Sequence, residues 1–390
     1  MSEWQKHKLG ELCTRITVGH VGSMASRYTE NGIPFLRSLN VKRGRIDLSA
    51  VKYINKGFHG QLAKSQLRPG DLVIVRTGDP GVTALIPDGL GPLNCSDVVI
   101  ATPRSDVDAR FLCYAINETA QEFVKAHTVG AVQQHFNVKS AKELTLHVPE
   151  LAHQQAVSGL LGALDDKIAV NERIAATADE LMRALYQEAC ANAAESITIG
   201  ELGRLIRDGV SASSLNGGEH YIGLEHMPRR NVWLSAWEES AELASGKSAF
   251  RSNDVLFGKL RPYFHKVGLA LTSGVCSTDI LVVRPAEPDR LGWLLLALSS
   301  DEVVAHASAV GDGTRMPRAK WRDLEPLVVP WPGNEEAARL DQVVRSMAAR
   351  VQASVTESRT LATLRDTLLP QLMSGRLRVK DAEKIVEDHA

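Results

Sequence analysis

The chain has 390 residues, a length that allows two or three domains. Its formal net charge of −1 gives no argument for a nucleic-acid or membrane partner, and its five scattered cysteines, without a Cys-x-x-Cys pair, argue against a disulfide framework or a zinc knuckle. No apolar run approaches the roughly 20 residues of a membrane span, so we expect a cytoplasmic protein with no membrane partner.

Strand and helix patterns alternate in residues 1–150, the first globular segment. Apolar, β-branched runs with turn residues at both ends predict strands over 70–78 and 97–103, and helical spacing of apolar residues follows over 109–127. The segment carries more Lys and Arg than Asp and Glu. We therefore expect a mixed α/β domain whose surface can approach a phosphate backbone.

A long helix is predicted next, over residues 153–186. The stretch has no proline, and apolar or small side chains recur with a period of about 3.5, the spacing of a helix that wraps another helix. The same seam returns near the end of the chain, shifted by 183 positions. Two unrelated amphipathic helices on separate cores remain the alternative. We predict an antiparallel coiled coil with the core residues Leu161, Leu164, Ile168, Asn171, Val344, Met347, Val351 and Ser354.

Short markers around the helices are duplicated as well. Lys64-Ser65-x-x-Arg68-x-x-Asp71 returns as Lys247-Ser248-x-x-Arg251-x-x-Asp254. Strand patterns over 254–267 and 279–285 and a helical pattern over 289–308 repeat those of the first segment. Several markers at a nearly constant offset indicate an internal repeat. We therefore predict an α+β fold in which a globular segment and a long helix occur twice.

The expected boundaries follow from this repeat. Pro370 is expected to interrupt the second long helix, Gly375 to cap it, and the charged tail to be poorly ordered. The parts that we expect are globular segments over 1–150 and 191–333, long helices over 151–190 and 334–378, and a tail over 379–390.

The chain lacks the motifs that would identify an enzyme. Gly-x-Gly-x-x-Gly, the Pro-Pro pair of amino-methyltransferases, His-Glu-x-x-His and Gly-x-Ser-x-Gly are all absent. Cys95 and Cys276 start duplicated strands, so we expect both to be buried structural residues. We expect no catalytic residue, metal or cofactor in this chain. A stand-alone DNA-modifying enzyme with an unrecognised active site and a protein-only scaffold stay open as alternatives.

Polar and basic side chains gather in loops at equivalent places of the two globular segments. Arg and Lys contact phosphate or guanine, and Asn reads adenine. Because the residues differ between equivalent loops, each segment is predicted to read something different. A solvated, charged hairpin tip is the alternative for residues 37–45. The candidate DNA contacts are Arg37, Asn40, Lys42, Arg43, Arg45, Arg76, Thr77, Gln133, Gln134, His135, His226, Arg229, Arg230, Lys259, Arg261, Tyr263, Arg315 and Arg318.

Several motifs together carry a resemblance to a known family. GELCTRITVG near the start, GDLVIVRTG, LFGKLRPYFHKV and the ending TLLPQLMSGRLRV, in their duplicated order, resemble the specificity subunits of type I restriction–modification systems. The similarity covers nearly the whole chain. It implies that each globular segment is a target-recognition domain that reads one half of a split, asymmetric DNA sequence. It also implies that the helix pair fixes the length of the unread spacer.

The resemblance further implies the partners of the chain. Two methyltransferase subunits would bind around it and bring S-adenosylmethionine with the catalytic Asn/Asp-Pro-Pro motif. A motor–nuclease restriction subunit that uses ATP can join them, and the chain itself would bind double-stranded DNA without catalysis. One departure from the family pattern is the first long helix, which ends in ALYQEACANA rather than in LLPQLMSG.

Overall fold

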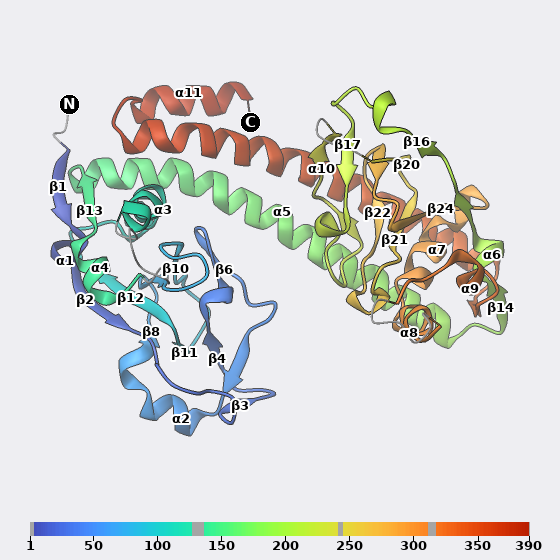
Figure 1. Cartoon of the computed structure of the whole chain (residues 1–390), viewed down its shortest axis with the longest axis horizontal. Coiled ribbons are helices and arrows are strands. Elements are labelled where there is room, and N and C mark those ends of the chain that lie inside the picture. Colours follow the sequence, from blue (N-terminus) through green and yellow to red (C-terminus); the bar gives the residue numbers. More distant parts are fainter. Residues whose placement is uncertain (1–3, 127–135, 241–244, 311–316, 390) are drawn as a thin grey trace. The chain divides into compact units, whose positions relative to one another are not determined.

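The computed structural model describes residues 4–126, 136–240, 245–310 and 317–389 (Figure 1). Its contacts divide the chain into unit 1, Met1–Asp166 with Thr360–Ala390, and unit 2, Lys167–Arg359. The chain passes between the units twice, each time inside a long helix, α5 (Leu151–Ala191) or α10 (Asn334–Met373). The predicted α+β class and both predicted long helices are confirmed.

Unit 1 is built around two sheets that pack against each other. One has the strand order β10–β9–β12–β2 and the other the order β3–β7–β4–β11–β8, while β1 pairs with β13 next to the start of α5. The strands are β1 (Gln5–Lys8), β2 (Cys13–Val18), β3 (Tyr28–Thr29), β4 (Ile33–Leu36), β7 (Lys52–Ile54), β8 (Gln66–Leu67), β9 (Leu72–Val75), β10 (Thr83–Leu85), β11 (Leu93–Cys95), β12 (Val98–Pro103) and β13 (Thr145–Val148).

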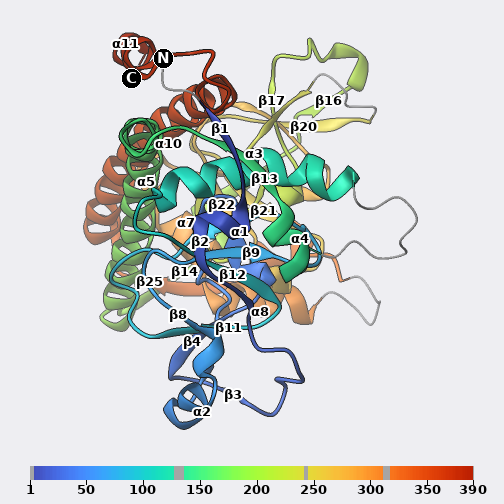
Figure 2. The same ribbon diagram turned by 90° about the vertical axis from the view of Figure 1, so that its left-hand side faces the viewer.

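The central strand β9 shows why its sequence is apolar without interruption. Successive side chains of a strand point to opposite faces of the sheet. Leu72 and Ile74 join the core that also contains α3 (Ala109–Ala126), whereas Val73 and Val75 join the core under the second sheet. Figure 2 shows α3 running beside the sheet of β9 and β12. The strand is therefore buried on both faces. The short helices of this unit are α1 (Leu9–Leu12), α2 (Lys56–Gln61) and α4 (Val138–Glu143).

Unit 2 repeats this topology. Its sheets have the orders β15–β24–β21–β22–β18 and β16–β20–β23–β17–β19, and β14 pairs with β25 next to the start of α10. The order β22–β21–β24–β15 matches β10–β9–β12–β2. The parallel pair of β4 with β11 is matched by that of β17 with β23, while the parallel pairing of β18 with β22 is an addition in unit 2. The predicted duplication is thus present in the strand order.

The bounds of the unit 2 elements are as follows. The strands are β14 (Glu195–Thr198), β15 (Gly203–Ile206), β16 (Gly209–Val210), β17 (His220–Ile222), β18 (Trp233–Leu234), β19 (Glu238–Glu239), β20 (Lys247–Phe250), β21 (Val255–Gly258), β22 (Val267–Ala270), β23 (Gly274–Cys276), β24 (Ile280–Pro285) and β25 (Val328–Trp331). The short helices are α6 (Ile199–Leu202), α7 (Leu291–Leu298), α8 (Asp301–Ala309) and α9 (Trp321–Leu324).

A buried carboxylate lies just before the central strand of each unit. Asp71 and Asp254 are each 1% exposed, and each accepts a hydrogen bond from the backbone N–H three residues earlier. In unit 1 the paired guanidinium comes from Arg15 on β2, 2.9 Å from Asp71 Oδ2. In unit 2 it comes from Arg284 on β24, which donates to Asp254 at 2.7 and 2.8 Å. The acid is duplicated, but a different strand supplies its cation.

The two long helices pack against each other in unit 2. Asn171 of α5 is 2% exposed, and its Nδ2 donates to the Ser354 carbonyl at 3.3 Å and to Glu357 Oε2 at 2.8 Å. Lys167 Nζ lies 3.3 Å from Glu357 Oε1. β14, which follows α5, pairs with β25, which precedes α10, so the end of α5 lies near the start of α10 and the pair is antiparallel in this unit. Two unrelated helices on separate cores are therefore excluded here.

The predicted core residues of the helix pair differ in burial. Ile168 and Met347 are only half-buried, and Ala348, beside Met347, is buried instead. In unit 1, the basic residue on the predicted seam, Arg365, donates to Asp165 at 2.8 Å, which explains how it is accommodated. The six other predicted residues are buried, namely Leu161, Leu164, Asn171, Val344, Val351 and Ser354.

Two details of the expected helices are wrong, and one is confirmed. The helix predicted over 289–308 is broken into α7 and α8, because the Ser300 side chain accepts from Val303 N–H and caps a new helix. Pro370 lies inside α10, which continues to Met373, because a proline in the last turn removes only one backbone donor. Gly375 follows the helix end with a φ of 69°, as a cap does.

The tail expected to be poorly ordered is a helix, α11 (Val379–His389). Its Ala382 is fully buried, and Val379 and Val386 pack against the core of unit 1. These apolar side chains on one face fix the charged segment, which composition alone does not reveal. Across the residues that the structure describes, no helix combines the length and the apolar character that a membrane span requires.

Candidate nucleic-acid interface

A small hairpin in unit 1 exposes three of the predicted cations. β5 (Val41–Lys42) pairs with β6 (Arg45–Ile46), and Arg43 and Gly44 form the turn. Gly44 has a φ of 76°, a conformation that glycine adopts without strain. Lys42, Arg43 and Arg45 are exposed, and Arg43 Nη2 lies 3.1 Å from Glu118 Oε2. The hairpin tip therefore presents a compact group of donors to solvent.

Asn40, just before this hairpin, has a structural role. It is fully buried; its Oδ1 accepts from Arg37 N–H at 3.1 Å and its Nδ2 donates to the Asp47 carbonyl at 2.9 Å. The prediction that Asn40 contacts DNA is wrong, because its amide closes the turn. The Arg37 guanidinium donates to the Ala50 carbonyl at 2.7 Å, so it too supports the loop that carries the hairpin.

The hairpin and the loop after β9 line a cleft of about 630 Å³ in unit 1. Lys42, Arg43 and Thr77 all contribute to its wall, so the structure brings these three predicted residues together. Gln121 on α3 lines the same cleft and donates to Asp79 Oδ1 at 3.2 Å. The sequence prediction missed Gln121, since the face of α3 that meets this loop depends on the sheet.

Arg76 is placed differently from its neighbour Thr77. Its side chain is 23% exposed, and its Nη1 lies 3.9 Å from Asp97 Oδ1, so an acidic side chain faces it from the next strand connection. The remaining candidates at the matched glycine turns lie outside the described residues, namely Gln133, Gln134, His135 and Arg315.

In unit 2 the turn between β21 and β22, residues 259–265, is the most concentrated group of candidates. We call it the Tyr263 turn. The Tyr263 ring is 53% exposed and lies edge-on to Phe264, with 4.9 Å between ring centroids. The guanidinium carbon of Arg229 lies 4.2 Å from the Phe264 centroid and that of Arg261 lies 5.9 Å from it. Phe264, which the prediction omitted, is therefore the residue around which three predicted ones assemble.

The backbone of this turn is strained. Arg261, His265 and the adjacent Arg230 have φ values of 52°, 54° and 54°. Residues other than glycine and asparagine seldom adopt this left-handed backbone conformation, because it costs roughly 1–2 kcal/mol of conformational energy per residue. Hydrogen bonds hold the turn from both sides, for example Arg230 N–H to the His265 carbonyl at 3.0 Å and Arg261 N–H to the Pro317 carbonyl at 2.9 Å. The turn is therefore held in one conformation.

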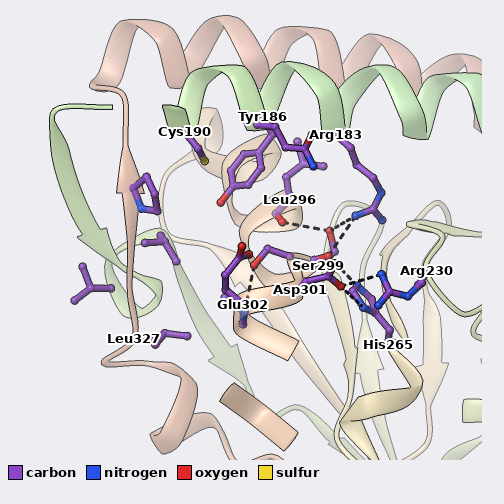
Figure 3. A pocket seen from close by; sticks show the side chains of 16 residues that line it. Arg183, Tyr186, Cys190, Arg230, His265, Leu296, Ser299, Asp301, Glu302 and Leu327 are labelled. Atoms are coloured by element: carbon purple, nitrogen blue, oxygen red, sulfur yellow. Dashed lines mark hydrogen bonds and ion pairs between the residues drawn. The ribbon is translucent and has the colours of Figure 1, made fainter. Parts of the chain in front are cut away.

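A pocket of about 630 Å³ lies beside the base of this turn, and Figure 3 shows Arg230, His265 and Asp301 converging in it. Arg230 Nη1 is 2.8 Å from Asp301 Oδ1. His265 Nε2 is 2.8 Å from the Ser299 carbonyl, which also accepts from Arg183 at 3.3 Å. Burial lowers the pKa of His265, so the neutral ring is favoured. These contacts anchor the turn, and the Arg230 guanidinium takes part in that anchoring.

The other candidates of unit 2 differ in whether their side chains are exposed or used in contacts within the unit. The His226 ring accepts from Gly223 N–H at 3.0 Å and lies 3.2 Å from Glu238, with a side chain only 10% exposed. The ring thus helps to close its own turn, and a DNA contact by His226 stays a prediction. Lys259 is half-buried and bonded through its backbone, whereas the Arg318 side chain is 57% exposed and 3.4 Å from Asp279.

The side chains of these loops can be compared with those of a metal site. Among the residues that the structure describes, no cluster of His, Cys, Asp and Glu could hold a metal ion. Cys95 and Cys276 are fully buried, as expected for structural residues, and burial raises the pKa of Cys276 to about 12. What the loops offer instead is exposed hydrogen-bond donors, positive charge and one exposed aromatic ring, a combination suited to nucleic acid.

Comparisons with known proteins found a family model that matches the N-terminal part of the chain. Residues 1–179 match the model of the type I restriction modification DNA specificity domain. The type I restriction enzyme HindI specificity subunit of Haemophilus influenzae is 25% identical over 199 residues, 48% of this chain and 40% of that protein. The alignment thus spans less than half of that relative's length.

A comparison with solved structures concerns the fold of the whole chain. The type I restriction–modification S subunit from M. genitalium superposes with a TM-score of 0.61 at 14% identity, covering 95% of this chain and 96% of that one. The HsdS subunit from Thermoanaerobacter tengcongensis gives a TM-score of 0.36 at 18% identity, covering 96% and 97%. The first of these shows that the two chains share a fold over nearly their whole length.

Proposed function

We infer that this chain, which carries a type I restriction modification DNA specificity domain, is the specificity subunit of a type I restriction–modification system. In this role it reads a bipartite, asymmetric sequence in double-stranded DNA. Unit 1 reads one half-site with the cleft around Lys42, Arg43 and Thr77. Unit 2 reads the other half-site with the Tyr263 turn.

One observation carries the proposal, the repetition of one strand order with different side chains at matching turns. The turn after β9 contains Thr77, Gly78 and Asp79, whereas the matching turn after β21 contains Arg261, Tyr263 and Phe264. Base edges are distinguished by the donors and acceptors that a loop presents. Two copies of one scaffold with different turns therefore suit two half-sites of different sequence.

The chain supplies recognition, and its partners supply chemistry. We propose that two methyltransferase subunits bind it and bring S-adenosylmethionine, and that restriction subunits which use ATP can join the complex. The chain itself needs no cofactor for this role. The absence of a Pro-Pro pair from the sequence supports this division, since amino-methyltransferases hold the target nitrogen with such a motif. The chain would act where the DNA is, in the cytoplasm.

The unread spacer should depend on the two long helices. The chain passes from unit 1 to unit 2 inside α5 and returns inside α10. At about 1.5 Å per residue, seven residues inserted into both helices lengthen the pair by about 10 Å, close to three base pairs. Such an insertion should therefore change the spacer by about three base pairs and leave both half-sites unchanged.

Selection from random DNA tests this function. The full chain, in complex with the methyltransferase subunits, would be incubated with a pool of random 40-base-pair duplexes, and the bound DNA would be sequenced. We expect a two-part motif separated by positions without preference. A single continuous motif, or no motif, would refute the bipartite reading. Methyl transfer by the purified chain alone would refute the division between recognition and chemistry.

A further inference from the structure

The Tyr263 turn places an aromatic ring where hydrogen-bond readout alone would not need one. Tyr263 is the most exposed large aromatic side chain described in unit 2, at 53%. Burying an aromatic ring is favourable, so leaving it in solvent at the tip of a turn is informative. The Phe264 ring supports it from one side, with 4.9 Å between centroids, so Tyr263 stands on a second ring rather than lying against the surface.

Positive charge surrounds this exposed ring. The guanidinium carbons of Arg229 and Arg261 lie over the Phe264 ring, at 4.2 and 5.9 Å from its centroid. A guanidinium that stacks by its face keeps its N–H groups available at the edge, where they can donate to phosphate. Lys266 adds a third cation beside Arg229, and the proximity of Arg229 contributes, after burial, to lowering the pKa of Lys266. The turn thus joins an exposed ring with donors suited to the DNA backbone.

Comparison with unit 1 shows that the side chains, and not only the backbone path, distinguish this turn. Gly78 occupies the place of Arg261, and both residues are left-handed, with φ values of 91° and 52°. The unit 1 turn has no aromatic residue between 76 and 82. Glycine would satisfy this backbone without strain, yet unit 2 places an arginine there. The arginine at this strained position places its guanidinium beside Phe264.

The turn is also preorganised. Phe264 N–H donates to the Arg261 carbonyl at 2.9 Å and His265 N–H to the Pro262 carbonyl at 2.7 Å, so Tyr263 is the middle residue of a short helical turn, Pro262–Phe264. On the flank, Ala319 N–H donates to the Lys259 carbonyl at 2.8 Å. A ring held in one position loses little conformational entropy when it meets a ligand.

We propose that Tyr263 stacks on a base of the half-site read by unit 2, and that Arg229 and Arg261 contact the phosphates beside that base. This inference rests on the proposed DNA-reading function and adds a second mode of recognition to it. An inserted ring partly unstacks two neighbouring base pairs. The sequence preference of unit 2 should therefore depend also on how easily these two base pairs come apart. Unit 1, whose matching turn has no aromatic residue, reads without such a ring.

Four variants test the proposal in the same selection from random 40-base-pair duplexes, with the full chain and its methyltransferase subunits. Tyr263→Ala removes the ring, and Tyr263→Phe keeps it. Arg229→Ala removes a proposed phosphate contact. Val328→Ala, which trims an apolar side chain that is 61% exposed in the same unit, is the matched control. Thermal melts establish that each variant is folded.

We expect Tyr263→Ala to weaken binding about tenfold and to lose preference at one or two adjacent positions of a single half-site. Tyr263→Phe and Val328→Ala should select the wild-type motif. Arg229→Ala should lower the slope of log affinity against log salt by about one, whereas Tyr263→Ala should leave that slope unchanged. In the selected duplex, 2-aminopurine at the affected position should brighten on binding wild type and not on binding Tyr263→Ala.

The outcomes separate this inference from the function on which it rests. If wild type selects a two-part motif and Tyr263→Ala selects the same motif with equal affinity, the stacking role is wrong and the DNA-reading function stands. If Tyr263→Ala loses preference at both half-sites, or melts well below wild type while Tyr263→Phe does not rescue it, the ring is structural and the inference is wrong. If wild type selects no two-part motif, both fail.

Discussion

Replacing Asp254 by Ala should destabilise unit 2 strongly. The carboxylate is 1% exposed, accepts two hydrogen bonds from Arg284 at 2.7 and 2.8 Å and a third from Arg251 N–H at 2.8 Å. Truncation leaves a guanidinium that is only 21% exposed without its counter-ion, and it leaves a backbone donor unpaired. Breaking a buried pair from one side costs about 3–5 kcal/mol. Because Arg284 keeps some access to water, we expect the lower end, about 3 kcal/mol.

Tryptophan fluorescence provides the assay. A loss of about 3 kcal/mol should lower the thermal midpoint of a domain of this size by about 6–12 °C. Trp4 belongs to unit 1, so the fluorescence change on unfolding reports mainly on unit 2. The tryptophans of unit 2 are Trp233, Trp237, Trp293, Trp321 and Trp331.

The double variant Asp254→Leu with Arg284→Met separates the unpaired charge from lost packing. Apolar side chains of similar size remove both charges, and such replacements are often neutral or stabilising. We therefore expect the double variant to melt above Asp254→Ala but below wild type, because both charges leave the site together while Arg251 N–H stays without its acceptor. The reasoning would be refuted if Asp254→Ala shifted the midpoint by less than about 2 °C, or if the double variant were no more stable than Asp254→Ala.

Three further measurements address other parts of the molecule. Burial raises the pKa of Cys276 to about 12, so iodoacetamide at pH 8 should label the half-exposed Cys190 before Cys276, and equal labelling of the two in the native protein would contradict this. Burial lowers the pKa of His265 below its usual 6.5, so stability present above that pH should be lost as pH falls; urea titrations at pH 7.5 and 5.5 should show a smaller loss for His265→Gln. Asn171→Leu should raise the thermal midpoint and let the complex select more than one spacer length, because a polar core residue fixes the register of a helix pair; a single unchanged spacer would rule out that role.

The sequence was sufficient for the fold wherever burial is complete. Within the strand predicted over 70–78, the structure forms β9 from Leu72–Val75. Both faces of that strand are covered, so its sequence is apolar without interruption. The helix pattern over 289–308 was less informative. Both α7 and α8 have helical spacing, and the break at Ser299 and Ser300 depends on a cap that competes locally with helix continuation.

The candidate interface was harder to predict, because a residue's type does not reveal whether its polar atoms are already used. Asn40 and Lys42 are two positions apart, yet Asn40 is fully buried and Lys42 is exposed. Their difference depends on a turn closed by Asp47, seven residues further along the chain. Phe264 was missed because an aromatic residue is ordinarily assigned to the core, whereas here its ring lies in a turn beside two arginines.

The two units together indicate how a duplicated scaffold can acquire two specificities. Asp71 and Asp254 keep the same place in the fold although Arg15 and Arg284 reach them from different strands, so the framework tolerates exchange of a partner as long as the buried charge stays paired. At the matching turn, Gly78 and Arg261 share a left-handed backbone but present different groups to solvent. The strain at Arg261 costs roughly 1–2 kcal/mol, less than the loss expected from an unpaired Asp or Arg in the framework. Side chains at the turns can therefore change at a smaller cost in stability than residues of the framework, and recognition can diverge between units whose cores remain alike.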